Sequence, residues 1–211
     1  MKTKIILSIM LLLAFILPGC VFSLYPLYTE NDLVYDSKLE GVWATPGSED
    51  SWKFENLLQH EMAPYKNKAD GEKEGSIKKT FINKKTYLLT YTENGEAREM
   101  QANLARLDDN LFLDIFPEEL KLKNSFFESQ YVPVHTYAKV KQTANGFELD
   151  FFDTDFLNKL LEQNTIRIKY ESFKDYKIIT ASTDELQKFV KKYADNPKLF
   201  GSPVVLTKKP K

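Results

Sequence analysis

The sequence has one cysteine, Cys20, among 211 residues, so no disulfide bond can form within the chain. Its eight glycines are scattered, which leaves no glycine-rich phosphate-binding loop, and no Gly-x-Ser-x-Gly nucleophile motif occurs. We therefore expect no bound cofactor. A chain of this length can be held together by its hydrophobic core alone, without disulfides or metals.

Histidine is equally scarce, since His60 and His135 are the only two. Without a second cysteine, a zinc site would need both histidines together with carboxylates. Their spacing matches no metal-binding motif, because His60-Glu61 lacks the second histidine of a His-Glu-x-x-His helix. His135 comes just before a predicted strand, where a local hydrogen bond is the simpler role. The sequence predicts neither a metal site nor catalysis by histidine.

Carboxylates gather where a predicted strand passes into a predicted helix, at Asp150, Asp153 and Asp155. Such a group could bind a cation or supply the acid–base pair of a glycoside hydrolase. Aspartates near a helix N-terminus more often cap the helix and complement its dipole. We favour capping here, and interpret the run from Asp108 to Asn110 as a turn for similar reasons. A hydrolase of envelope polymers remains an alternative function.

Neither sign of charge is in excess, with 29 basic and 30 acidic residues. Removing residues 1–19, which contain Lys2 and Lys4, leaves 27 basic and 30 acidic residues. A nucleic-acid-binding protein would need a basic surface and a high isoelectric point. The sequence therefore excludes nucleic acid as the expected partner.

The N-terminus has the three parts of a secretory signal. Lys2 and Lys4 form a cationic segment, and residues 5–17 are apolar apart from Ser8. A retained transmembrane helix would need roughly 18 or more apolar residues, and Pro18-Gly19 ends this run sooner. Ordinary secretory cleavage is also disfavoured, since no Ala-x-Ala pattern precedes Val21.

The stretch Leu17-Pro18-Gly19-Cys20 resembles the lipobox of bacterial lipoproteins. The resemblance implies that a diacylglyceryl group is attached to the thiol of Cys20. It also implies cleavage between Gly19 and Cys20, so that residues 1–19 are a removed signal peptide. The expected location is the exported side of a bacterial membrane. Val21 stands where some Gram-negative lipoproteins carry an aspartate that retains them at the inner membrane, which favours the outer membrane facing the periplasm.

Residues 20–35 form an N-terminal segment that is expected to join the anchor to the domain. Its start, residues 21–28, is apolar and aromatic, unlike the Gly- and Ser-rich tether that follows most lipoprotein anchors. Such a segment could lie along the membrane interface, where tyrosine is favoured, or pack onto the domain. We favour packing onto the domain.

Residues 36–211 are predicted to form one β-rich domain. Strands are expected at 41–45, 51–55, 85–92, 96–107, 111–116, 136–142, 147–151 and 165–171, with Asn94-Gly95 and Asn145-Gly146 as hairpin turns. Two short helices are expected in the C-terminal half. The first carries apolar residues at 156, 157, 160 and 161 after a cap at Thr154 or Asp155, and the second begins with the capping box Ser182–Glu185. The fold class is mainly β (α+β), an antiparallel sheet that could be curled or closed into a lipocalin-like barrel.

Two further resemblances bear on this domain. Gly41-Val42-Trp43 resembles the Gly-x-Trp entry to the first strand of lipocalin-like barrels, in which the tryptophan plugs one end of the barrel. The mature chain also resembles a set of uncharacterised bacterial lipoproteins, through residues 25–28, 39–43, 112–114 and 180–187. That family has no established activity, so the resemblance implies architecture and location only.

The expected function is that of a non-enzymatic, membrane-anchored envelope lipoprotein. Its partners are the membrane, through diacylglyceryl-Cys20, and either a small hydrophobic ligand or an envelope protein. A ligand would occupy a pocket inside the curled sheet, which requires small inward-facing residues. A solid domain would instead act as a scaffold that docks to other envelope components.

Overall fold

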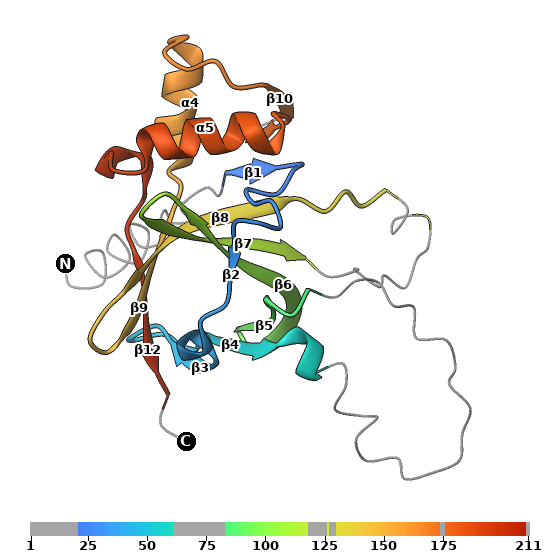
Figure 1. Cartoon of the computed structure of the whole chain (residues 1–211), viewed down its shortest axis with the longest axis vertical. Coiled ribbons are helices and arrows are strands. Elements are labelled where there is room, and N and C mark those ends of the chain that lie inside the picture. The colour runs from blue at the N-terminus through green and yellow to red at the C-terminus, as the bar shows by residue number, and fades with distance from the viewer. Residues whose placement is uncertain (1–20, 61–82, 118–125, 127–129, 174–175, 210–211) are drawn as a thin grey trace, which may run out of the picture.

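The computed structural model describes residues 21–60, 83–117, 126, 130–173 and 176–209, and within them the chain forms a closed antiparallel barrel (Figure 1). This confirms the predicted mainly β fold class. The barrel strands are β3 (Gly41–Ala44), β4 (Ser51–Asn56), β5 (Thr86–Glu93), β6 (Glu96–Leu107), β7 (Asn110–Pro117), β8 (His135–Gln142), β9 (Gly146–Phe151) and β12 (Val204–Lys208).

The barrel closes through its last strand. Strands β3 to β8 pair in sequence order, β9 pairs with β8, and β12 lies between β9 and β3. The contact of β12 with β9 covers four residue pairs, from Val204↔Leu149 to Thr207↔Gly146. Its contact with β3 covers two, Thr207↔Ala44 and Lys208↔Trp43. Closure removes the exposed edges that an open sheet would have.

Strand β8 pairs with different strands along its length. Its C-terminal part, from Ala138, pairs with β9 inside the barrel, whereas His135 and Thr136 pair with β1 (Phe22–Ser23). Strand β1 also pairs in parallel with β11 (Tyr176–Ile179), which pairs with β10 (Tyr170–Phe173). The sheet therefore branches at β8 into a small extension outside the barrel.

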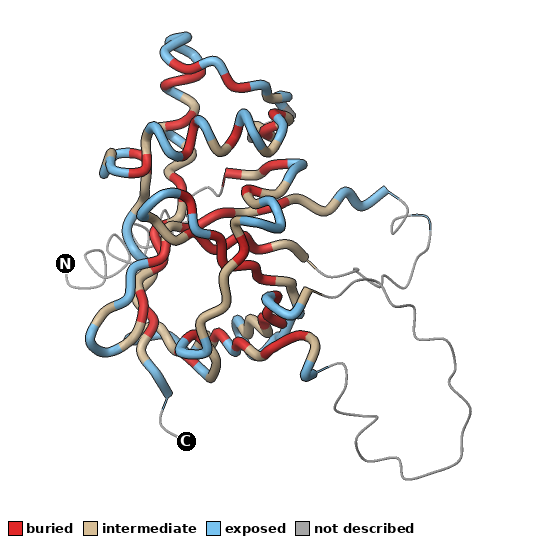
Figure 2. The backbone as a smooth tube through the Cα atoms, viewed as in Figure 1, coloured by how far each residue is buried: buried red, intermediate tan, exposed pale blue. Residues whose placement is uncertain are grey.

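The barrel interior is lined by a cluster of buried, mostly large side chains. Figure 2 shows buried residues on every side of the ring. Inward positions alternate along the strands, as expected for a barrel. The buried residues of this first core are Leu39, Trp43, Trp52, Phe54, Tyr87, Leu89, Ala102, Leu104, Leu113, Ile115, Ala138, Val140, Phe147, Leu149 and Leu206.

A second core lies outside the barrel, between its wall and the helices α4 (Thr154–Glu162) and α5 (Thr183–Tyr193). Outward-facing Phe112 and Tyr137 of the barrel wall pack in this core with Leu157 of α4 and Val190 of α5. The helices thus cover one outer face of the barrel (Figure 1). No helix in the described part of the chain is long and apolar enough to cross a membrane.

The helix termini follow local sequence rules, with one correction. The predicted capping box of α5 is present, since the Ser182 side chain accepts from the Glu185 N–H and Glu185 reaches back to Ser182. Helix α4 is capped by Asp153, not by Thr154 or Asp155 as predicted, and its carboxylate accepts from the Phe156 N–H at 2.6 Å. Both caps satisfy N–H groups that have no partner within the helix.

The predicted strand at residues 165–171 is wrong for most of its length, because β10 begins only at Tyr170. Residues 165–169 lack strand pairing, although Ile166 and Ile168 are buried in the second core as their alternation suggests. Alternating burial arises wherever an extended segment lies against a core, so it does not require a neighbouring strand.

The N-terminal segment packs against the barrel. Val21 and Leu27 are buried in the second core, and β2 (Leu33–Val34) pairs with β6 through Leu33↔Ala105. A 3-10 turn, η2 (Ser37–Leu39), then leads into β3. Cys20, by contrast, lies outside the described residues.

Candidate functional site

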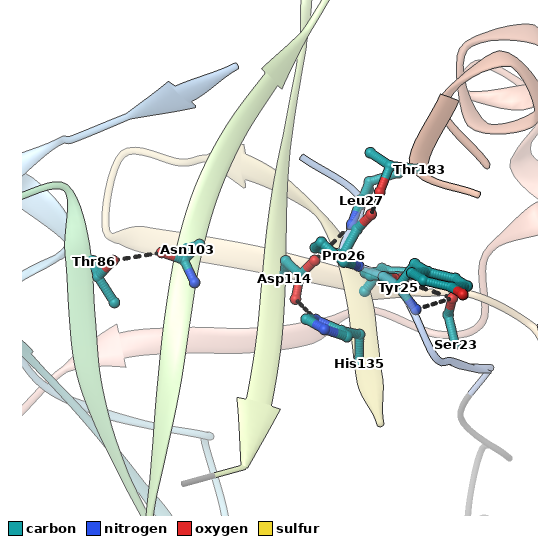
Figure 3. A network of polar contacts seen from close by, with 10 residues as sticks. Ser23, Tyr25, Pro26, Leu27, Thr86, Asn103, Asp114, His135 and Thr183 are labelled. Atoms are coloured by element: carbon teal, nitrogen blue, oxygen red, sulfur yellow. Dashed lines mark hydrogen bonds and ion pairs between the residues drawn. The ribbon is translucent and has the colours of Figure 1, made fainter. Parts of the chain in front are cut away.

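A group of buried polar contacts lies where the N-terminal segment crosses β7 and β8 (Figure 3). Asp114 of β7 is fully buried, and His135, the first residue of β8, is nearly so. We define the clamp as Asp114 and His135 of the barrel together with Ser23, Tyr25 and Leu27 of the N-terminal segment. Tyr137 of the barrel contacts the clamp through Tyr25.

Asp114 joins two parts of the chain that are far apart in sequence. One of its carboxylate oxygens lies 2.7 Å from Nδ1 of His135, and the other accepts a hydrogen bond of 2.8 Å from the backbone N–H of Leu27. The His135 ring packs on Phe116, with ring centroids 4.4 Å apart. A buried carboxylate is stable only when its oxygens are bonded in this way.

The second half of the clamp holds the turn after β1. The Ser23 hydroxyl donates to the carbonyl oxygen of Tyr25 at 3.1 Å and accepts from the Tyr25 N–H at 3.2 Å. The Tyr137 hydroxyl also donates to the Tyr25 carbonyl. Further along, Thr183 at the start of α5 donates to the carbonyl of Pro26 at 2.8 Å. Side chains from the barrel and from α5 therefore fix residues 23–27.

Burial governs the electrostatics of the clamp. It raises the pKa of the Asp114 carboxyl, although hydrogen bonds from His135 and Leu27 act in the opposite direction. Burial and the nearby Asp114 charge raise the pKa of Tyr28 to about 12, and the same causes raise the pKa of Tyr137 further. Both phenols therefore stay protonated and able to donate hydrogen bonds at neutral pH.

An aspartate that orients a histidine is also part of many hydrolytic sites. Ser23 lies opposite His135 in the β1–β8 register. However, Ser23 is fully buried and its hydroxyl is bonded to the backbone of Tyr25, so it is not presented to a substrate. The arrangement suits a structural clamp better than a nucleophile.

Gly41 and Trp43 lie at the barrel end where β3 begins. The Trp43 ring is buried in the first core, and its Nε1–H donates to the carbonyl of Leu39 at 2.7 Å. Lys208 of β12 lies over this ring, 5.4 Å from its centre. Gly41 has φ +126°, and a Cβ there would lie 3.3 Å from the Lys208 side chain. Both features suit a tight entry of the chain beside a tryptophan at the barrel end.

The other predicted residues are not brought together. His60 is exposed, far in sequence from the clamp, and has no described contact with it. Asp150 pairs with Lys141 at 2.6 Å, Asp153 caps α4, and Asp108 pairs with Lys191 at 3.1 Å. Within the described ranges, no group of three or more His, Cys, Asp or Glu side chains could hold a metal ion. Gly19 and Cys20, the predicted cleavage and lipidation residues, lie outside the described residues.

Cavities are found on the outer surface. One of about 350 Å³ lies beside β8 and β9 and is lined by Lys139, Asp150 and Phe200, among others. Another, of about 440 Å³, follows α5 and is lined by Arg167 and Lys192, among others. Lys139 donates to the carbonyl of Ala194 at 2.8 Å, and Lys141 is paired with Asp150, so the cations of the first cavity are already engaged.

Sequence reasoning missed Asp114 and Ser23. A signal for Asp114 was present, because it is the one charged residue in the apolar run Leu111–Phe116. A charged residue is rarely buried in a strand unless it is paired. Ser23 carried no such signal, since β1 has only two residues. Comparison with known proteins adds nothing to these observations: no protein-family model, curated protein or solved structure matches this chain.

Proposed function

We propose that this protein is a bacterial envelope lipoprotein, anchored through diacylglyceryl-Cys20, whose barrel is a non-enzymatic docking module for an envelope protein. The observation that carries the proposal is the clamp. It holds the segment that directly follows the lipobox, and Val21, the next residue after Cys20, is already buried. A barrel joined so closely to its anchor would be presented at a membrane surface. The residue at position 21 favours the outer membrane.

The large buried side chains inside the barrel support docking over the carriage of a small hydrophobic ligand. A ligand-binding barrel of eight strands needs small inward residues. Here Trp43, Trp52, Phe54 and Tyr87 occupy that space, and Phe54 and Tyr87 are fully buried. The Tyr87 hydroxyl also accepts from the Asp36 N–H and donates to the Asp36 carbonyl, which ties the first core to the residue that directly follows the N-terminal segment.

The contacts made by Asp150 and Asp153 support a non-enzymatic role. A hydrolase of envelope polymers would need Asp150 and Asp153 free to act on a substrate. Asp150 is instead buried against Lys141, and Asp153 is bonded to the backbone of Phe156.

The anchor is tested by replacing Cys20 with serine in the full chain, produced in a bacterium fed with labelled palmitate. The thiol is the only site for the thioether, so we expect complete loss of label and accumulation of the unprocessed chain. Ser23→Ala, which changes a nearby hydroxyl without touching the lipobox, is the control and should keep its label. Label retained by the serine variant would disprove the anchor.

The docking role is tested by native mass spectrometry of the lipidated protein released from membranes in detergent. We expect the mass of the lipidated chain, alone or with a second protein, and no bound small molecule that is lost on denaturation. An extra mass of a few hundred daltons, on the order of one lipid or smaller ligand held in a site of this size, would instead establish carriage.

A further inference from the structure

Four large apolar side chains are exposed beside the β1–β8 pairing, two after β1 and two before β8. They are Leu24, Tyr25, Tyr131 and Val132, with exposed fractions of 39%, 49%, 39% and 65%. We call them the edge patch. Exposed apolar residues that cluster, unlike single ones, mark surfaces that contact a partner or a membrane.

The first two residues of the edge patch are exposed although their backbone is fixed. The N–H of Leu24 donates to the carbonyl of Ile179 at 2.9 Å, which continues the pairing of β1 with β11. The N–H and carbonyl of Tyr25 are both bonded to Ser23, and the carbonyl also accepts from Tyr137. The clamp therefore holds this turn so that its side chains face outward.

The strand register brings the two halves of the edge patch together. Ser23 is opposite His135 in the antiparallel pair of β1 and β8. Leu24 and Tyr25 directly follow Ser23, whereas Tyr131 and Val132 precede His135 by four and three residues. Both pairs of side chains therefore lie beyond the same end of the β1–β8 pairing.

The anchor is close to the edge patch along the chain. Three residues separate Cys20 from Leu24. Leu24 is thus four positions along the chain from Cys20, and a fully extended chain spans at most about 3.6 Å per residue, so the two lie within roughly 15 Å of each other. No flexible spacer intervenes, because Val21 is buried and β1 begins at Phe22. A lipid attached to Cys20 would therefore bring the edge patch to the bilayer surface.

We propose that the edge patch inserts into the headgroup region of the membrane that holds Cys20. This inference rests on the proposed lipid anchor and deepens it, since it fixes the orientation of the barrel. Its chemistry fits a bilayer interface, where tyrosine rings and aliphatic side chains lie between water and the acyl chains. The barrel end near Val42 would then face away from the membrane, because β1 and β3 lie on opposite sides of the barrel (Figure 1).

The single cysteine makes a direct test possible. Once Cys20 carries its lipid, its sulfur is a thioether, and a second cysteine placed by substitution is the only thiol that a fluorescent label can modify. The variants are Tyr25→Cys and Val132→Cys in the edge patch, with Val42→Cys as the matched control on an exposed strand residue. Each labelled, full-length lipidated protein is placed in phosphatidylethanolamine–phosphatidylglycerol vesicles that carry a spin-labelled lipid.

We expect the spin-labelled lipid to quench the fluorescence at positions 25 and 132 and to leave position 42 unchanged. If the protein is lipidated and vesicle-bound but all three positions respond alike, the inference is overturned and the anchor stands. If an added protein, and not the spin-labelled lipid, changes the fluorescence at positions 25 and 132, the inference is also overturned. The edge patch would then be assigned to that partner. If the mass of the Cys20 peptide shows no lipid, both the anchor and the inference fall.

Discussion

Replacing Asp114 with alanine should lower the free energy of unfolding by about 2–5 kcal/mol, because each of two buried groups loses its hydrogen-bond partner at a cost of about 1–3 kcal/mol. The variant leaves His135 without its partner at 2.7 Å and the Leu27 N–H without an acceptor, both in a buried setting. Urea denaturation followed by tryptophan fluorescence measures the change. Hydrogen exchange should also show that the Leu27 amide loses protection before the barrel strands do.

Asp150→Ala is the matched control. Asp150 is also a buried strand aspartate with a close cationic partner, but Lys141 is half exposed and can be solvated when the pair is lost. We expect a loss of about 1 kcal/mol or less, as for pairs open to solvent. Equal losses for the two alanine variants would contradict the role assigned to the clamp.

The Asp114 clamp should also respond to pH in a defined direction. Because burial raises the pKa of Asp114 above its ordinary value of 3.8, the folded state binds a proton more tightly than the unfolded state does. The stability that this proton contributes is fully present below the ordinary pKa of 3.8. It is lost as the pH rises through the higher pKa that Asp114 has in the folded state. Relative to Asp114→Asn, the native protein should therefore lose stability as pH rises from about 4. If the native protein instead gained stability relative to Asp114→Asn as the pH rises, folding would lower the pKa of Asp114.

Gly146→Ala should open the seam that closes the barrel. A Cβ at this position would lie 1.9 Å from the carbonyl oxygen of Leu206, a distance that no pair of such atoms tolerates. Gly146 pairs with Thr207 where β9 meets β12, so relief requires the two strands to separate. Overpacking typically costs 1–3 kcal/mol, and a clash with backbone should reach at least about 3 kcal/mol. Thermal denaturation followed by circular dichroism measures the loss.

The Gly47→Ala variant distinguishes the stability lost to this clash from the stability lost to backbone strain. Gly47 has φ +80°, so alanine is strained there too, but nothing lies within 4 Å of its added Cβ. The expected cost is that of the left-handed backbone alone, about 1 kcal/mol. If Gly146→Ala were no more harmful than Gly47→Ala, the β9–β12 seam would not be as tightly packed as described.

Local signals sufficed to predict most of the barrel. Asn94-Gly95 makes the hairpin turn that the sequence predicted, with φ of 51° and 80°, and β6 has the predicted bounds of 96–107. Hairpin turns and alternation are encoded by neighbouring residues, so they can be found in a single sequence. Strand β12 was not predicted, because it has no adjacent partner strand in the sequence, and closure of the barrel could be raised only as one possibility.

The clamp could not be predicted, because its parts are distant in the chain. The contact between Leu27 and Asp114 joins residues 87 positions apart, and β1 is too short to show alternation. Its strand character comes entirely from the partners β8 and β11. Isolated short strands have little stability of their own, so their position depends on the assembled fold.

The position of β1 would set an order of events if, as we propose, the chain is exported and anchored through Cys20. Its partners are β8, which begins at His135, and β11, which ends at Ile179, so β1 could pair only after residues up to 179 had crossed the membrane. The residues next to Cys20 would emerge first and would be fixed only once β11 had followed. That interval would leave the cysteine accessible to the enzymes that attach the lipid and cleave the signal.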